Sequence, residues 1–334
     1  MGHRFRPGFL IFWLLLLLIV PVIWSRVKLN LLHVDLLHTY ASQPDEMNSS
    51  PIIVTQSARM LGRFFYLLGE LELAEGLFLQ AATGGQVELA MSDLCLLYFE
   101  QGRAEDALRA CQESAVPIEY WMLRGENAKQ AGDPDAAWRA FQLAAGLDPD
   151  NAKPLLKLGA LLEESHDDQS LIELLAPWLE AHRGHDPGIY AQLGNAYQGQ
   201  GNPSQAIAIW EAGAGYFPEN ALLQQFLGYA YHDLGELGSA ARHYDRYLEL
   251  SDNPRPSLYI RRGQVAEGLE NWEDAVIFYE QAISNAPESV EAWLGLGRST
   301  QALGLDSRAV EAYQQVLELE PANEFAHEQL AELR

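Results

Sequence analysis

Residues 259–287 read YIRRGQVAEGLENWEDAVIFYEQAISNAP, and residues 293–321 read WLGLGRSTQALGLDSRAVEAYQQVLELEP. Both stretches begin with an aromatic residue, have glycine four residues later, and continue through a turn to alanine, a second aromatic residue and proline. A third copy keeps the same landmarks at Tyr190, Gly194, Ala206, Trp210 and Pro218. Neighbouring copies are offset by 34 or 35 residues, so the chain contains an internal repeat of the length typical of stacked helical units.

The landmarks have a physical explanation. Each copy holds two amphipathic helices of about 12–15 residues, which are too short to be stable alone. Glycine and alanine are small where the two helices touch, so the helix axes can approach closely. We expect the aromatic residues to fill the space between one helix pair and the next, and proline to end the second helix. Stacking then buries a continuous core, and stability is roughly a sum of neighbour terms.

These residues resemble the tetratricopeptide repeat family, in which W-x2-L-G-x2-Y is followed by A-x3-F and then by proline at a period of 34 residues. Further copies surround Gly62, Gly125 and Gly228, and degenerate ones surround Cys95 and Gly159. The resemblance implies an all-α fold, a right-handed α-solenoid of about eight helix-turn-helix units. One N-terminal transmembrane helix is expected before it, from the apolar run at residues 9–24. The expected units start near residues 55, 88, 118, 152, 187, 221, 256 and 290.

The N-terminus is of a different kind. Residues 9–24 read FLIFWLLLLLIVPVIW, contain no charge and have basic residues on both sides. With one flanking residue at each end, the stretch reaches the lower edge of the length that crosses a bilayer. We interpret it as an uncleaved membrane anchor. A cleaved signal peptide is the main alternative, although no small-residue cleavage pattern follows the apolar run. A buried helix of a soluble protein is a third reading.

Four segments follow from this interpretation. They are a signal-anchor (1–28), a membrane-proximal helix and linker (29–54), the solenoid (55–323) and a C-terminal capping segment (324–334). Apolar residues at near-helical spacing favour a helix just after the anchor, at Leu29, Leu32, Leu36 and Tyr40. The basic residues before the anchor favour a cytoplasmic N-terminus, which places the body outside the cytoplasm.

Composition excludes several functions. The chain has 22 lysine and arginine residues against 46 acidic ones, a net charge of −24, which argues against binding nucleic acid. Two cysteines are too few for a disulfide-rich scaffold or a four-cysteine zinc site. The sequence contains no P-loop, dinucleotide-binding glycine motif, H-E-x-x-H or G-x-S-x-G. We therefore expect no catalytic residue, no cofactor and no metal.

Two small features need a separate interpretation. The densest set of metal-ligating residue types is read as solvated loops, at His166, Asp167, Asp168, His182 and His185. Cys95 and Cys111 fall in the same repeat and should lie near one another in the core. We interpret them as two buried small residues; a disulfide is the alternative if the body is extracytoplasmic. No basic group is placed to make either one a reactive thiolate.

The resemblance also implies a binding surface. In tetratricopeptide repeats the first helix of each pair lines a concave groove, which suits an extended peptide or a partner's helix. Carrying the repeat phase over gives a candidate partner-binding groove at Arg59, Arg63, Tyr66, Phe99, Met122, Glu126, Lys129, Asn195, Gln198, Gln225, Tyr229, His232, Gln264, Glu267 and Arg298, with Gln56 and Glu163 beside them.

The expected function is a membrane-anchored scaffold that binds a protein or peptide partner and organises a complex. Receptors for acidic chaperone tails are not matched, because Ala191 stands where the lysine that accompanies Asn195 should be. Membrane-anchored repeat proteins that end in a metal-binding module are not matched either, because the C-terminus has no C-x-x-C. The alternatives are an accessory or regulatory subunit of an envelope enzyme or secretion assembly, and a homo-oligomeric structural protein.

Overall fold

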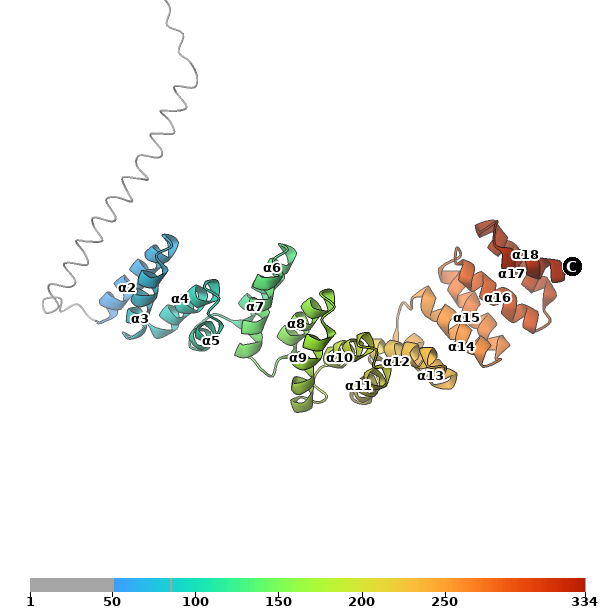
Figure 1. Ribbon diagram of the computed structural model, residues 1–334, viewed down its shortest axis with the longest axis horizontal. Coiled ribbons are helices and arrows are strands. Elements are labelled where there is room, and N and C mark those ends of the chain that lie inside the picture. Colours follow the sequence, from blue (N-terminus) through green and yellow to red (C-terminus); the bar gives the residue numbers. More distant parts are fainter. Residues whose placement is uncertain (1–50, 85, 334) are drawn as a thin grey trace, which may run out of the picture. The chain divides into compact units, whose positions relative to one another are not determined.

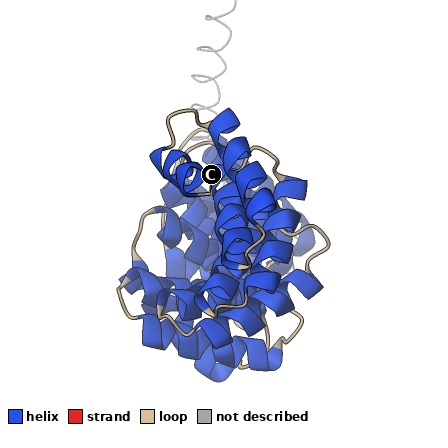
Figure 2. Cartoon of the chain, turned by 90° about the vertical axis from the view of Figure 1, so that its right-hand side faces the viewer, coloured by secondary structure: helices blue, strands red, loops and turns tan. Residues whose placement is uncertain are grey.

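The computed structural model describes residues 51–84 and 86–333. In these ranges it contains seventeen helices and no strand (Figure 2). The anchor assigned to residues 1–28 and most of the expected linker lie outside the described residues. Among the described helices, none is long and apolar enough to cross a membrane.

The chain divides into two compact units, residues 1–115 and 116–334. The described helices of the first unit are α2 (Pro51–Leu67), α3 (Leu71–Ala82), α4 (Val87–Glu100) and α5 (Ala104–Gln112). The second unit begins with α6 (Ile118–Gln130), α7 (Pro134–Leu147), α8 (Ala152–Glu164), α9 (Asp168–Ala181), α10 (Pro187–Gly199) and α11 (Pro203–Tyr216). It continues with α12 (Ala221–Asp233), α13 (Leu237–Leu250), α14 (Pro256–Gly268), α15 (Trp272–Asn285), α16 (Val290–Ala302), α17 (Asp306–Leu319) and α18 (Glu324–Glu332).

The first sixteen described helices form eight pairs, which follow one another along the chain, and α18 comes after the last pair (Figure 1). We call the first helix of each pair helix A and the second helix B. The expectation of eight helix-turn-helix units is confirmed, and helices A of the last six pairs begin at the residues expected from the sequence. Within each unit, every helix A after the first also packs on helix B of the preceding pair, which makes the arrangement a solenoid.

The repeated glycine allows the two helices of a pair to touch. A Cβ atom on Gly125 would lie 2.4 Å from the ring of Phe141, which is fully buried in helix B of the same pair. Tyr279 lies between two such glycines, because a Cβ atom on Gly263 of its own pair or on Gly295 of the next would lie within 3 Å of its ring. The aromatic residues therefore pack inside each pair as well as between pairs, which the sequence interpretation did not include.

Left-handed backbone closes the turns between helices A and B. Six of the eight turns have a glycine with positive φ, at Gly69, Gly102, Gly132, Gly201, Gly235 and Gly304. In the other two turns the left-handed residue is His166, with φ 56°, or Glu270, with φ 57°. Glycine adopts this conformation at no steric cost, whereas a residue with a Cβ atom is strained in it.

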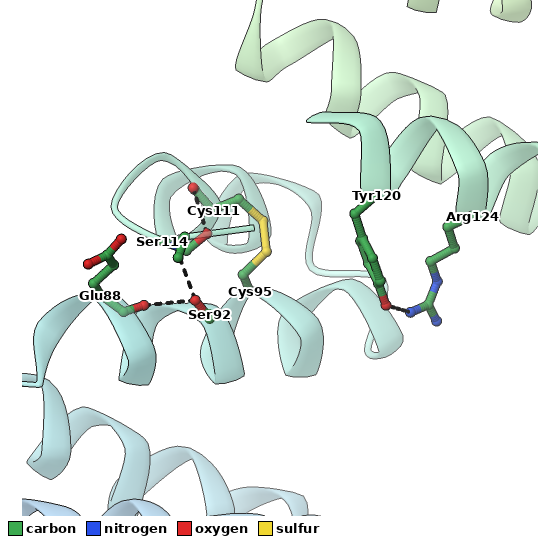
Figure 3. The surroundings of a disulfide bond; sticks show 8 residues. Glu88, Ser92, Cys95, Cys111, Ser114, Tyr120 and Arg124 are labelled. Carbon is green, nitrogen blue, oxygen red and sulfur yellow. Dashed lines mark hydrogen bonds between the residues drawn. A yellow bond between two sulfur atoms is a disulfide. The ribbon is translucent and has the colours of Figure 1, made fainter. Parts of the chain in front are cut away.

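A disulfide joins the two helices of the second pair (Figure 3). Cys95 in α4 and Cys111 in α5 are buried, and their Cα atoms are 4.9 Å apart. The expectation that they lie together in the core is confirmed, and the interpretation as two unbonded residues is corrected. Helix α5 has only nine residues, so the bond holds a helix that has fewer packing contacts to offer than the 14-residue helices B of the second unit.

The C-terminal pair is closed by α18. The ring of Phe325 in α18 meets that of Tyr313 in α17 edge to face, with centroids 6.1 Å apart. Ala326 and Leu330 are buried against the same pair. The apolar side of the last repeat is thus covered within the chain.

Candidate partner-binding surface

The sequence-derived groove residues share one face of the helices A. We number each repeat from its expected start, so that the repeated glycine of helix A, or Cys95 in the second repeat, stands at position 8. The groove residues then occupy positions 5, 9 and 12, which lie on one side of an α-helix because they are three or four residues apart. We call this surface the A-helix face and describe it for each unit separately.

In the first unit, two candidate residues are used to hold the fold together. Arg59 and Arg63 of α2 both form ion pairs with Asp93 of α4, at 2.6 and 2.8 Å. Asp93 is only 7% exposed, and the two guanidinium groups supply the hydrogen bonds that water would otherwise give its carboxylate. Tyr66 is half-buried and Phe99 is buried. Of the residues in this unit, Arg63 therefore offers the most exposed side chain on the A-helix face.

At the start of the second unit, ion pairs connect α6 to α8. Glu126 pairs with Lys157 at 2.5 Å, and Lys129 pairs with Glu164 at 2.6 Å. Each pair joins neighbouring helices A, and the participating side chains are partly or largely exposed. Such pairs contribute about 0–1 kcal/mol each, so they set the register of adjacent helices more than they stabilise them. Met122 packs against the core instead.

Between α8 and α10 the contacts are amide hydrogen bonds. Gln192 donates to the carbonyl oxygen of Leu156 at 3.1 Å. Burial raises the pKa of the Glu163 carboxyl above its ordinary value, although hydrogen bonds from Asn195 and Gln192 oppose the shift. Gln198 is exposed beside them. Glu163, which the sequence placed on this face, thus contacts the predicted residue Asn195.

The middle of the face, on α12 and α14, is aromatic and cationic. Gln225 donates a hydrogen bond to the Tyr229 hydroxyl at 3.0 Å, and the Arg261 guanidinium lies 4.7 Å from the centroid of the Tyr229 ring. The Tyr229 and His232 rings both contact Tyr244, which is fully buried in α13. Burial lowers the pKa of His232 below its ordinary value, and nearby Arg261 lowers it further. We call Gln225, Tyr229, His232 and Arg261 the central cluster.

Polar contacts resume between α14 and α16. Gln264 donates to Glu291 at 2.7 Å. Glu267 accepts hydrogen bonds from Arg298 at 2.9 Å and from the Ser299 hydroxyl at 3.2 Å. The predicted residues Glu267 and Arg298 are therefore partners of one another across adjacent helices A.

The central cluster differs from the rest of the face in its charge balance. The other cations named above, such as Lys129, Lys157 and Arg298, each have a carboxylate partner on a neighbouring helix A. Among the described residues, Arg261 forms no such ion pair, and Nδ1 of His232 is buried without a hydrogen-bond partner. A half-exposed guanidinium over an aromatic ring is suited to bind a polar or anionic group of another molecule.

Arg261 was missed by the sequence reasoning. It stands at position 6 of its repeat, whereas the predicted groove residues stand at positions 5, 9 and 12. Position 6 points at the preceding pair, and the sequence signal for it was the tyrosine at position 9 of that pair, Tyr229. A cation and an aromatic residue one repeat apart in these positions would have indicated the contact.

The suspected set of metal-ligating residues is dispersed by the structure. Asp167 caps α9 by accepting a hydrogen bond from the backbone N–H of Ser170. His182 interacts with Asp150 at 3.0 Å and stacks on the Trp178 ring. In the part of the chain that the structure describes, no three His, Cys, Asp or Glu side chains are placed to hold a metal ion.

Two hollows lie away from the A-helix face. One, of about 350 Å³, lies between α9, α10 and α11 and is lined mainly by Leu179, Tyr190, Ile209 and Tyr216. The other, of about 420 Å³, lies between α15, α16 and α17 with Ile283 and Trp293 in its lining. The lining of the second hollow also includes Glu280 and Arg308, which form an ion pair with each other.

Comparison with known families supports the repeat assignment. A model described as tetratricopeptide repeat matches residues 79–233, and a second model with the same description matches residues 260–324. Together they account for more than half of the chain.

Two curated proteins show the same relationship. Protein CTR9 homolog of Arabidopsis thaliana is 24% identical over 253 residues, which are 70% of this chain and 23% of that protein. Tetratricopeptide repeat protein 7B of Homo sapiens is 27% identical over 149 residues, which are 45% of this chain and 17% of that protein. The chain thus spans less than a quarter of the length of either relative.

Among solved structures, YrrB, a tetratricopeptide repeat protein with an unusual peptide-binding site, has the same fold. It matches with a TM-score of 0.52 and 19% identity over 57% of this chain and 98% of its own. The similarity concerns the path of the backbone.

Proposed function

The chain belongs to the tetratricopeptide repeat family, and on that premise we propose that it is a membrane-anchored scaffold that binds a protein or peptide partner through its A-helix face. Proteins of this family are generally scaffolds and not enzymes, and their fold is suited to protein–protein interaction. The binding step is surface complementarity with no covalent chemistry. By holding its partner at the membrane, the scaffold would organise a membrane-associated complex.

The central cluster is the observation that carries the proposal. It combines a tyrosine ring, a guanidinium without a carboxylate partner and a side-chain amide on one half-exposed surface. Aromatic and arginine side chains are enriched among residues that dominate binding energy. Elsewhere on the same face the cations are already paired, so a partner would have to displace an existing contact.

The membrane part of the proposal is supported by the sequence of residues 9–24, which is apolar throughout and has basic residues on both sides. The disulfide between Cys95 and Cys111 supports a body outside the cytoplasm, because such bonds persist in oxidising compartments. A body carrying many acidic residues would also stand off from anionic lipid head groups.

The binding proposal is tested with Arg261→Glu in the full-length protein. Partners are crosslinked in the native membranes, captured with the protein and counted by mass spectrometry. We expect capture of the specific partner to fall by about tenfold or more, because a charge-assisted hydrogen bond contributes about 1.5–3 kcal/mol. Arg261 is preferable to Tyr229 and His232 as a target, since those two contact the buried ring of Tyr244.

Arg242→Glu is the matched control. Arg242 lies in α13, a helix B, is exposed, and interacts with Ser239 of its own helix. It should leave capture unchanged while altering the net charge equally. Equal capture by both variants and the unaltered protein would refute the A-helix face as the binding surface.

The anchor and its orientation are tested separately. The full-length chain should stay in the membrane pellet after a high-salt wash and should be digested by protease added to sealed spheroplasts. Recovery of a soluble chain that has lost residues 1–41 would refute the anchor. A body that resists protease until the spheroplasts are lysed would refute its place outside the cytoplasm.

A further inference from the structure

Each repeat has one side that faces the pair before it, and position 6 of helix A lies on that side. Phe226 at position 6 of α12 stacks on Trp210 of α11, with ring centroids 5.3 Å apart. Gly295 at position 6 of α16 is so close to α15 that a Cβ atom would lie 2.3 Å from the Tyr279 ring. Position 6 is thus a contact to the preceding pair.

Positions 13 and 19 lie on the same side. Glu164 at position 13 of α8 pairs with Lys129 of α6 at 2.6 Å. Arg308 at position 19, in α17, forms an ion pair with Glu280 of α15. In every later repeat, positions 13 and 19 hold a polar or a small residue. Together, positions 6, 13 and 19 define what we call the leading side of a repeat.

The leading side of the first repeat is apolar and uncovered. Its three positions hold Met60, Leu67 and Leu73, which are 74%, 81% and 42% exposed. No described helix precedes α2. Large apolar side chains are thus exposed at positions where later repeats contact a preceding pair, an arrangement that is costly in water.

The two ends of the repeat series differ in this respect. At the C-terminal end α18 covers the last pair, with Ala326 and Leu330 buried beneath it. Helical repeat proteins require such capping elements, because an open end exposes the surface that would otherwise receive another repeat. The first repeat has the surface that calls for a cap, and the described residues contain no cap for it.

We propose that residues 26–40 of this chain form a helix that packs on the leading side of the first repeat and acts as its cap. Residues 26–40 would make a helix of 15 residues, about 22 Å long. Its apolar face would consist of Leu29, Leu32, Leu36 and Tyr40. That length matches the 14-residue helices B that cover this side of later repeats.

The connection is long enough for this docking. Residues 41–50 separate the segment from α2, and ten residues reach up to about 33 Å when extended. The proposed cap begins two residues after the apolar stretch 9–24. Its packing on the first repeat would therefore hold that repeat close to this stretch. The proposal goes beyond partner binding and does not depend on it, since the A-helix face takes no part in the contact.

A photo-crosslinking experiment on the full-length chain tests the cap. A benzophenone amino acid replaces Met60, the protein is irradiated in detergent micelles, and the crosslinked peptides are identified by mass spectrometry. We expect crosslinks to peptides within residues 26–40 of the same chain. The control places the same probe at Leu79 of α3, which is 47% exposed at position 25, away from the leading side, and it should not capture that segment.

Every other outcome overturns the proposal. Crosslinks from residue 60 to detergent would make the apolar surface a membrane contact, and crosslinks between isotopically distinct chains would make it a dimer interface. No crosslink, or an intact mass showing that residues 26–40 have been removed, would mean that this segment covers nothing. If these experiments refute the cap, the proposal of partner binding and its test with Arg261→Glu are not affected.

Hydrogen exchange gives an independent measure. Leu32→Asp together with Leu36→Asp should speed exchange of the α2 amides by about tenfold or more, since burying a leucine contributes roughly 1.5–3 kcal/mol. Leu31→Asp is the control, because residue 31 lies on the opposite face of the expected helix and should change the rates little. Equal effects of the two variants, or none from either, would refute the packing of this face on α2.

Discussion

Replacing Gly62 with alanine tests whether the close contact inside a helix pair determines the repeat. A Cβ atom at residue 62 would lie 2.7 Å from two carbons of the Phe78 ring. That is about 1 Å inside the ordinary contact distance between carbons. Phe78 is 1% exposed, so its ring has little room to withdraw.

The expected magnitude follows from two opposing terms. Alanine is better than glycine in a helix interior by about 1 kcal/mol, while forcing a methyl group into a packed core costs about 1–3 kcal/mol. Gly76→Ala in α3 isolates the first term, because a Cβ atom at residue 76 meets nothing within 4 Å. The clash should therefore separate the two variants by about 1–3 kcal/mol, with Gly62→Ala the less stable.

Native-state hydrogen exchange of the α2 and α3 amides is the suitable assay, because repeat proteins open locally. Phe78→Leu in the Gly62→Ala background should recover part of the loss, giving a coupling energy of at least about 0.5 kcal/mol. If the two glycine variants change the local free energy of unfolding by the same amount, the close contact does not control packing and the argument from the repeat pattern fails.

Three further predictions concern the first unit and pH. Replacing Cys95 and Cys111 with serine should destabilise the helix pair α4–α5 by about 3 kcal/mol, the contribution of a disulfide that closes a loop of this length. The measurement is amide exchange in α5, which should become faster. Unchanged exchange would show that helix packing alone holds the pair together. Asp93→Ala should cost about 1.5–3 kcal/mol, because it removes the charge-assisted hydrogen bonds that Arg59 and Arg63 donate to this carboxylate. An unchanged midpoint of urea unfolding would contradict this. Burial lowers the pKa of both His232 and His243 in the folded protein. The unfolded chain therefore binds protons at these residues more strongly than the folded chain does. Folding stability is full above pH about 6.5 and decreases as pH falls from there through the lowered pKa values. The urea midpoint should therefore drop from pH 7.5 to 5.5, and His243→Gln should make that drop smaller; an equal drop in the variant would remove His243 from the explanation.

Much of the fold could be predicted because the repeat states the same rule several times. The landmark residues Gly125 and Phe141 recur at the same spacing in other repeats, which fixes the phase of both helices. Their contact with each other was not part of the sequence interpretation. The start of the first unit was placed at residue 55, whereas α2 begins at Pro51. Helix ends depend on local capping and on few contacts, so the repeat pattern constrains them less.

The A-helix face was predicted less completely. The phase placed Glu267 and Arg298 on one surface, but the sequence does not indicate that they bind each other, because that depends on the distance between two helices A. It also made Arg59 a surface residue, although its charge is matched by the buried carboxylate of Asp93. Side chains at position 6 contact another repeat, so a pattern read within one repeat does not find Arg261.

The disulfide lay at the limit of what sequence can decide. The repeat phase brought Cys95 and Cys111 to facing positions, which is confirmed by Cα atoms 4.9 Å apart. Whether two facing cysteines bond depends on side-chain geometry and on the redox compartment. Neither is written in the spacing of the landmarks.

His166 and Glu270 show that the repeat tolerates strain in its turns. Both take a left-handed conformation that glycine supplies in the other six turns, at a cost of about 1 kcal/mol each. A natural protein needs only to stay above a stability threshold. A loss of about 1 kcal/mol in one turn can be tolerated because contacts between neighbouring repeats also stabilise the fold. Each of these turns lies three residues after position 12, and the backbone N–H groups of His166 and Glu270 donate to the carbonyl oxygens of Glu163 and Glu267. A repeat array can therefore contain a strained turn in single repeats while the other turns keep glycine.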